Sequence, residues 1–339
     1  MRAKLLLLIM VVFMPVSASI AAWAPSRAAL DDAWQYSIAH NGYSLIVIQH
    51  GRVLLEGNAP GDGPGVRHKI YSGTKGLWCV AAVAAQADGI LDLDEPVAAT
   101  ITEWRGEPGR GGITIRQLLN FTAGVDPGFH LHSDEVADRD AYAVALRQVA
   151  PPGESFIYGP GQIQVFCELL RRKLAARGGE TPWHYLVRRV LRPAGLGNVP
   201  HKVDAAGEPL LASGVLLTAR EWARWGEFLL AGGRGRVGDL GECLRGSACN
   251  RAFGMGFWLN HAASYGRAVN VEDDLDPDWR RQDWSGACLC CDAPRDLFVS
   301  LGSMGQRLYI IPSLDMVVVR LSADSHYSDA EFLRLLLST

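Results

Sequence analysis

Lysine is scarce in this sequence, and positive charge gathers nowhere along it. The 339 residues contain 33 lysines and arginines against 36 aspartates and glutamates, which gives a formal net charge of −3. Only five of these cations are lysines, and the basic runs are no longer than short groups such as residues 171–173. Proteins that bind nucleic acid carry a concentrated basic surface. We therefore expect no nucleic-acid partner.

The sequence also lacks the ligand spacing of a metal site. No Cys-x-x-Cys pair has a matching second half, and His130-x-His132 is equally isolated. A structural zinc site takes four such ligands, usually as two closely spaced pairs. Residues 59–66 are rich in glycine and proline but lack the Gly-Lys-Ser/Thr ending of a phosphate-binding loop. We expect neither a metal nor a cofactor.

The seven cysteines fit an oxidising compartment without requiring one. Cys243 and Cys249 bracket a short loop and could form a disulfide. Inert thiols are the alternative, and the odd count leaves at least one cysteine unpaired within the chain. Three further cysteines crowd together, and one of them could bond elsewhere: Cys288, Cys290 and Cys291.

A targeting segment is predicted at the N-terminus. A short basic region precedes an apolar run over residues 5–16, and small residues follow. This is the order of a secretory signal peptide. Residues 1–21 are therefore predicted to be a signal peptide, cleaved after Ala18 or Ala21, and the mature protein to be periplasmic or secreted. An uncleaved anchor is the alternative, although Pro15 and two serines make a poor membrane helix. Membrane contact is expected only through this segment.

Apolar patterns predict a mixed protein of strands and helices. Two apolar runs around a central glycine predict a β-hairpin over residues 43–58. Helical patterns prevail in the middle of the chain, and strand patterns return near its end. The predicted helices are 113–119, 138–149, 161–177, 182–192, 216–230 and 328–337, and the later predicted strands are 254–259, 296–301, 307–311 and 315–320.

These elements combine into an α/β (α+β) fold. Strands from both ends of the chain are expected to build one antiparallel sheet flanked by helices, with an all-helical domain inserted between them. The predicted sheet domain covers residues 22–95 and 205–339, and the predicted helical domain covers residues 96–204. Sites often lie at such domain junctions.

Ser72 stands at the start of an apolar segment that runs to Gln86, and Lys75 follows three residues later. On a helix, positions i and i+3 share a face, so the hydroxyl and the amine meet as a nucleophile and its base. Burial would lower the pKa of the lysine. Random placement gives about 0.3 Ser-x-x-Lys pairs in this composition, so the pair alone is weak evidence. A serine cap before a solvated lysine is the alternative.

Further segments strengthen this interpretation. Ser72-Gly73-Thr74-Lys75 resembles the S-x-x-K signature of serine β-lactamases and penicillin-binding proteins. Residues 113–124 resemble the family's ITIRHLLTHTSGL segment, and residues 213–221 its GGLxSTAxDLA segment. Tyr158 resembles the tyrosine motif of the class C branch. Residues 302–306 resemble the glycine-rich third motif of the esterase and 6-aminohexanoate-dimer hydrolase relatives. The resemblance extends over residues 43–322 and implies a β-lactamase/transpeptidase-like fold.

The resemblance also implies roles for these residues. Ser72 would be the acylated nucleophile, Lys75 its base, and Tyr158 a second acid and base whose phenolate is favoured beside a charged lysine. The backbone N–H groups of Ser72 and Gln306 would form the oxyanion hole. The remaining residues of the third motif would bind substrate: Ser303, Met304 and Gly305.

Three departures from the family pattern bear on the substrate. The usual Tyr-x-Asn is Tyr158-Gly159-Pro160 here, and proline offers no side-chain amide. Ser303 stands where a lysine or histidine is usual, so the cation that meets a β-lactam carboxylate is missing unless Arg307 or another arginine replaces it. No Glu-x-x-Leu-Asn segment supplies the deacylating glutamate of the class A branch. A neutral ester or linear amide, held against aromatics such as Trp104 or Trp258, fits better than a β-lactam.

The leading hypothesis is an exported serine hydrolase that cleaves a small ester or amide through a Ser72 acyl-enzyme. One alternative is a non-catalytic ligand-binding protein of the same fold, which the altered second and third motifs favour. Another is a penicillin-binding D,D-peptidase-like enzyme. The oligomeric state stays open.

Overall fold

The structure, a computed structural model, describes residues 23–323 and 326–338. The predicted signal peptide lies outside these residues. Within the described ranges, no helix is both long and apolar enough to cross a membrane.

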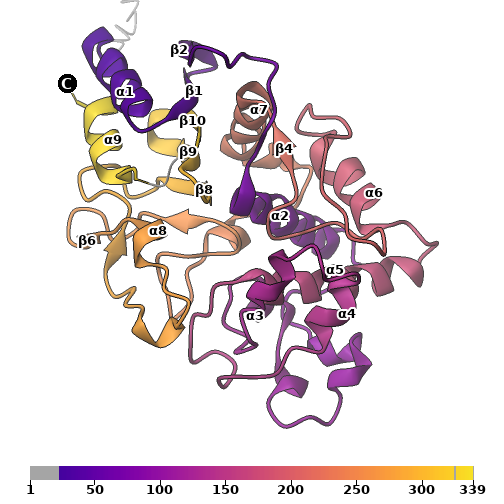
Figure 1. The fold of residues 1–339 in the computed structure, drawn as a ribbon. Coiled ribbons are helices and arrows are strands. Elements are labelled where there is room, and N and C mark those ends of the chain that lie inside the picture. The colour runs from indigo at the N-terminus through magenta and orange to yellow at the C-terminus, as the bar shows by residue number, and fades with distance from the viewer. Residues whose placement is uncertain (1–22, 324–325, 339) are drawn as a thin grey trace, which may run out of the picture.

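A six-stranded sheet joins the two ends of the chain (Figure 1), in the order β2-β1-β10-β9-β8-β5. All its strand pairs are antiparallel, and the pairing of β1 with β10 brings the start and the end of the described chain together. The predicted hairpin and antiparallel sheet are confirmed. The strands are β1 (Gly42–Gln49), β2 (Arg52–Asn58), β5 (Trp258–Leu259), β8 (Phe298–Gly302), β9 (Gln306–Ile311) and β10 (Met316–Ser322).

The strand predicted over residues 254–259 is much shorter in the structure. Only Trp258–Leu259 forms a ladder, with β8. Gly256 has a positive φ of 76°, and the N–H of Gly254 donates to the carbonyl of Phe257, which closes a tight turn. Glycine adopts this conformation readily, so the segment turns where an extended strand was predicted.

Helices cover both faces of the sheet. Helices α1 (Arg27–Ala39) and α9 (Asp329–Leu336) contact each other on one face, and α7 (Ala219–Leu230) packs on β1, β9 and β10 from the other (Figure 1). Successive strand residues point to opposite faces. Tyr309 therefore stacks on Phe332 of α9, while its neighbour Leu308 lies next to Gly226 of α7. Every residue of β9 and β10 is buried.

Helix α2 (Thr74–Ala87) forms the centre of the molecule (Figure 1). Its residues from Thr74 to Ala85 are all buried, which confirms the predicted buried helix. The helical region that follows contains α3 (Ile115–Leu119), α4 (Arg139–Val144), α5 (Pro160–Ala175) and α6 (Pro182–Leu186), the last continuing as a π-helical turn over Val187–Leu191. The smaller elements are β3 (His68–Lys69), which pairs with β4 (Leu216–Leu217), β6 (Arg267–Ala268), which pairs with β7 (Ala287–Cys288), and α8 (Val271–Asp274).

The capping residues of two helices agree with the predictions from the sequence, but the length of a third helix does not. Thr114 and Thr218 each form a capping box at the start of α3 and α7. Helix α4 ends at Val144, well before the predicted residue 149. The residues beyond it turn back, and Val149 donates its N–H to the carbonyl of Gly124. The predicted domain boundaries remain predictions.

All seven cysteines lie in the described part of the chain, and none of them forms a disulfide there. Cys243 is buried, and Cys249 donates its thiol to the carbonyl of Gly153 at 2.9 Å, so the suggested pairing of these two is absent. The Sγ atoms of Cys288 and Cys291 lie 3.0 Å apart as thiols. Burial raises the pKa of the Cys243 thiol, which makes it unreactive.

Candidate active site

Ser72 lies in a single 3₁₀ turn, Tyr71–Gly73, directly before α2. The segment predicted as one helix therefore begins with a tighter turn that leaves Ser72 half-buried. Tyr71 has a positive φ of 44°, which costs a non-glycine residue roughly 1–2 kcal/mol. Such strain persists where the surroundings hold it, and it is frequent at reactive sites.

Lys75 meets Ser72 as the i, i+3 spacing predicted. Its Nζ lies 2.8 Å from the Ser72 Oγ and 3.1 Å from the carbonyl oxygen of Ala212, to which it donates. The side chain is buried, and desolvation lowers its pKa to about 7. A substantial fraction of Lys75 is therefore a free amine at neutral pH and can accept the Ser72 proton.

Tyr158 joins Ser72 and Lys75 in the site. It precedes α5, with Gly159 between them. Its ring centroid lies 4.7 Å from the Lys75 Nζ, and the ring packs edge-on against Phe121 at 5.0 Å. Desolvation raises the pKa of Tyr158, although its hydrogen bond with Ser72 lowers it in part. The prediction that the phenolate is favoured is therefore wrong, because burial disfavours the charged form of Tyr158. Tyr158 is a neutral phenol.

The end of β8 is pressed against the turn that carries Ser72. The Oγ of Ser300 donates to the carbonyl of Gly73 at 3.0 Å. A Cβ added to Gly302 would stand 2.0 Å from the carbonyl oxygen of Ile70, a separation that atoms do not reach. Only glycine allows this approach, and it brings Ser303, the next residue, beside the nucleophile.

The third-motif residues are divided between the pocket and the turn. Ser303 lines the pocket with Ser72, Lys75 and Tyr158. The N–H groups of Met304 and Gly305 donate to Glu272 at 2.8 and 3.1 Å, so they are not open to substrate.

The position of Gln306 does not agree with its expected role as oxyanion donor. Gln306 pairs with Gly302 across the hairpin, is buried, and does not line the pocket. Its side chain bonds to Ser322 instead. The sequence motif does not show where strand β8 ends. The end of that strand decides which residue of the motif lies beside Ser72.

The pocket around Ser72 has a volume of about 250 Å³. Partial burial and the charge of Lys75 lower the pKa of His132, so this histidine is neutral. Sequence patterns missed most of the pocket lining, because its residues come from separate loops and carry no motif. These missed residues include Phe129, His132, Glu272, Leu275, Asp276, Pro277 and Gln282.

A family model described as Beta-lactamase matches residues 28–337. The chain belongs to the β-lactamase family. It is 25% identical over 309 residues to the 6-aminohexanoate-dimer hydrolase of Paenarthrobacter ureafaciens, covering 83% of this chain and 72% of that protein.

Solved structures of the β-lactamase fold are similar to this structure. A putative β-lactamase from Bacteroides dorei superimposes with a TM-score of 0.65 at 19% identity, covering 93% of this chain and all of the other. A D-stereospecific amidohydrolase from Streptomyces has a TM-score of 0.62 at 18% identity, with the same coverage of 93% and 100%. The predicted fold and family are confirmed.

In this β-lactamase-family chain, Arg307 does not replace the missing cation. Its side chain is buried, with the guanidinium 2.7 Å from Asp329 and 2.8 Å from Glu272. The suggested aromatic walls are also absent from the pocket lining. Trp104 is buried and donates its ring N–H to the carbonyl of Val144, and Trp258 packs behind the Tyr158 ring at 5.9 Å. Both tryptophans belong to the core.

The proline of the second motif has a structural reason. Pro160 is the first residue of α5, where a missing backbone N–H costs nothing because helix N-termini leave such groups unpaired. Pro160 also lines the pocket, where the family's asparagine would place an amide. The pocket therefore lacks that hydrogen-bonding group at this position.

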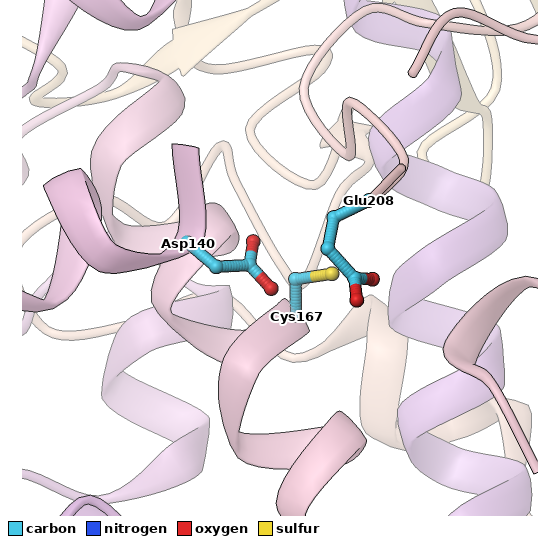
Figure 2. Close-up of side chains that lie close together, drawn as sticks. All are labelled: Asp140, Cys167 and Glu208. Atoms are coloured by element: carbon cyan, nitrogen blue, oxygen red, sulfur yellow. The ribbon is translucent and has the colours of Figure 1, made fainter. Parts of the chain in front are cut away.

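Within the described residues, one group of side chains has atoms close enough to hold a metal ion: Asp140, Cys167 and Glu208, whose ligand atoms lie within 4.8 Å of one another (Figure 2). Burial raises the pKa of Asp140 to about 8 and raises that of the Cys167 thiol. The group therefore holds protons at neutral pH, which a metal would have to displace. Asp140 and Glu208 line a different cavity, so the group is separate from Ser72.

Proposed function

We propose that this protein is an exported serine hydrolase that cleaves a small ester or amide through an acyl-enzyme on Ser72. The contact of 2.8 Å between the Ser72 Oγ and a buried Lys75 with a pKa of about 7 carries the proposal. A nucleophile beside a desolvated amine is the arrangement that activates a hydroxyl. The related 6-aminohexanoate-dimer hydrolase supports hydrolysis as the reaction class.

In the acylation step, the free amine of Lys75 takes the Ser72 proton while the Oγ attacks the carbonyl carbon. The electron pair of the C=O bond moves to oxygen and returns when the leaving group departs. The proton held by Lys75 reaches that leaving group through the Tyr158 hydroxyl. In deacylation, water attacks the acyl carbon, loses a proton to the same pair, and Ser72 regains its own.

Two backbone N–H groups stabilise the oxyanion, those of Ser72 and Ser303. Ser303 takes the place first expected for Gln306, because Ser303 follows the glycine that lies against Ile70 and lines the pocket. Loss of one such donor typically costs ~3–4 kcal/mol of transition-state stabilisation. Ser303 therefore contributes through its main chain.

The substrate is proposed to be a neutral ester or linear amide. An anionic substrate such as a β-lactam carboxylate meets no arginine among the described residues that line the pocket. Arg307 is paired with two carboxylates. Glu272 and Asp276 line the pocket and oppose a negative charge, while Phe129 and Leu275 offer apolar surface.

Replacement of Ser72 by alanine tests the reaction. We expect the hydrolysis of short-chain nitrophenyl esters to fall to the background rate, since no nucleophile remains. Intact-mass measurement after an activated phosphonate should show one adduct on the wild-type chain and none on Ser72→Ala. A wild-type protein that forms no adduct would favour the non-catalytic alternative, and a long-lived penicillin adduct would favour the D,D-peptidase-like one.

The mass of the exported protein tests cleavage after Ala18 or Ala21.

A further inference from the structure

The turn that joins β8 to β9 holds its backbone in an unfavourable conformation. Met304 and Gly305 both have positive φ angles, 64° and 71°. Glycine accepts this region freely, but methionine does not. A strained residue of this kind persists only where neighbouring groups hold it in place.

Side chains bind the polar backbone groups of this turn from several directions. The carboxylate of Glu272 accepts the N–H groups of Met304 and Gly305 at 2.8 and 3.1 Å. The Gln306 side chain donates to the carbonyl of Met304 at 3.0 Å, and Arg320 donates to that of Gly305 at 2.8 Å. Of these three side chains, that of Glu272 also lines the Ser72 pocket.

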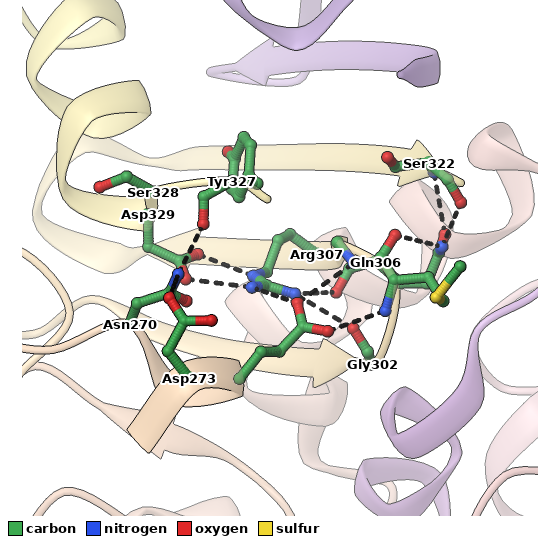
Figure 3. A network of polar contacts seen from close by, with 12 residues as sticks. Asn270, Asp273, Gly302, Gln306, Arg307, Ser322, Tyr327, Ser328 and Asp329 are labelled. Atoms are coloured by element: carbon green, nitrogen blue, oxygen red, sulfur yellow. Dashed lines mark hydrogen bonds and ion pairs between the residues drawn. The ribbon is translucent and has the colours of Figure 1, made fainter. Parts of the chain in front are cut away.

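Glu272, on helix α8, is itself held by a network of charges around Arg307. Arg307 donates to the Glu272 carboxylate at 2.8 Å, to Asp329 at 2.7 Å and to the carbonyl of Gly302 at 3.1 Å. The contacts of Arg307 with Asp329 and Gly302 can be followed in Figure 3. Tyr309 donates to the same Asp329 at 2.5 Å. A half-buried carboxylate between an arginine and two N–H groups has little freedom to move. The network therefore connects the final helix of the chain to the turn beside the nucleophile.

We propose that Glu272 is a positioning residue, which holds the turn at residues 303–305 so that the Ser303 N–H points at the oxyanion formed on Ser72. This inference rests on the proposed hydrolase function. Without the carboxylate, Met304 relaxes from its left-handed conformation, and the peptide that carries the Ser303 N–H turns with it. The effect falls on the transition state, where the negative charge develops, and leaves the binding of the uncharged substrate nearly unchanged.

Glu272→Ala and Glu272→Gln provide the test, with a nitrophenyl ester as substrate. We expect kcat to fall roughly 10²–10³-fold for alanine, the usual effect of losing an oxyanion donor, with KM within about 3-fold of wild type. Glutamine keeps one acceptor oxygen and should lose only about 10-fold in kcat. If Glu272→Ala does not fold, the glutamine variant decides.

Glu242→Gln is the matched control. The Glu242 side chain is 12% exposed against 10% for Glu272, and it accepts from Arg116 at 2.6 Å, but it does not line the Ser72 pocket. If the role of Glu272 were purely structural, kcat would fall by similar factors in Glu272→Gln and Glu242→Gln. We expect kcat of Glu242→Gln within about 2-fold of wild type, as for an ion pair far from the chemistry.

A boronic acid that forms a tetrahedral adduct with serine separates positioning from other roles. Its inhibition constant should rise in parallel with the loss in kcat/KM, because the adduct places an oxygen in the oxyanion hole. A rise in KM with unchanged kcat, or an unchanged boronate affinity, would overturn the inference. A wild-type chain that no phosphonate labels would refute the proposed function itself, so the two failures are distinguishable.

Discussion

At the scale of single residues, burial shifts the pKa values of ordinary side chains. Lys75 has no carboxylate partner among its contacts in the described chain, and desolvation alone brings its pKa down to about 7. The same desolvation raises the pKa of Tyr158. In the proposed mechanism, the two groups therefore take separate roles at neutral pH: the amine accepts a proton and the phenol donates one.

The pH dependence of hydrolysis follows from the Lys75 pKa. The protonated amine cannot accept the Ser72 proton, so kcat/KM of an ester should rise with pH and level off above an apparent pKa of about 7. Lys75→Met should reduce kcat/KM by roughly 10²–10⁴-fold. Lys69→Met, at an exposed position, should leave the profile unchanged. A profile that is flat between pH 5.5 and 8.5 would exclude Lys75 as the base.

At the scale of elements, the end of strand β8 determines the geometry of the site. Gly302 lies against Ile70, Ser303 enters the pocket, and Met304 turns back under Glu272. Helix α5 makes a similar contribution, since its first residue, Pro160, follows Tyr158 after a single glycine. Both elements place a functional group at their ends, where the backbone changes direction.

Gly302→Ala tests the role of β8. The added methyl group would stand 2.0 Å from the carbonyl oxygen of Ile70, so the strand must move away from Ser72. We expect the free energy of unfolding to fall by roughly 1–3 kcal/mol, as for overpacking, and kcat to fall at least about 10-fold.

Gly63→Ala is the control, because nothing lies within 4 Å of its added carbon. Its free energy of unfolding should stay within about 0.5 kcal/mol of wild type. Equal kcat values for Gly302→Ala and wild type would contradict the close approach of β8.

At the scale of the whole molecule, two clusters of ionisable groups in the described chain illustrate how burial acts outside the nucleophile pair. The network of Arg307, Glu272 and Asp329 is held together by ion pairs. In the group of Asp140, Cys167 and Glu208, burial instead favours the protonated forms, and it raises the pKa of Asp140 from 3.8 to about 8. The first couples the final helix to the site, and the second links stability to pH.

Asp140 predicts how stability depends on pH. Its folded pKa is raised, so the folded state holds a proton that the unfolded state releases above pH 3.8, and stability falls as pH rises toward about 8. Asp140→Asn is neutral throughout and keeps an oxygen for Gln164, which donates to Asp140 at 2.6 Å. When the pH rises from 5 to 8, the free energy of unfolding in urea should fall by roughly 2–4 kcal/mol more in wild type than in the variant. Equal losses would show that Asp140 is ionised in the folded protein.

Much of the fold follows from local patterns in the sequence. The hairpin at residues 43–58, the caps Thr114 and Thr218 and the buried helix after Ser72 were all predictable, because turn chemistry, capping and periodicity act over a few neighbouring residues. The prediction failed for the segment 254–259, where a turn with Gly256 at positive φ interrupts the strand. It also failed for the end of α4, where Val149 bonds to the distant Gly124.

The sequence by itself determined that Ser72 and Lys75 face each other, because residues three apart share one face of a helical turn. Only the tertiary structure decided the rest of the site. The rise in the Tyr158 pKa depends on desolvation. The burial of Arg307 depends on a salt bridge with a residue 22 positions away. The proposed choice of Ser303 over Gln306 as oxyanion donor depends on where strand β8 ends. Burial and long-range contacts arise only when the whole chain packs, so local patterns do not encode them.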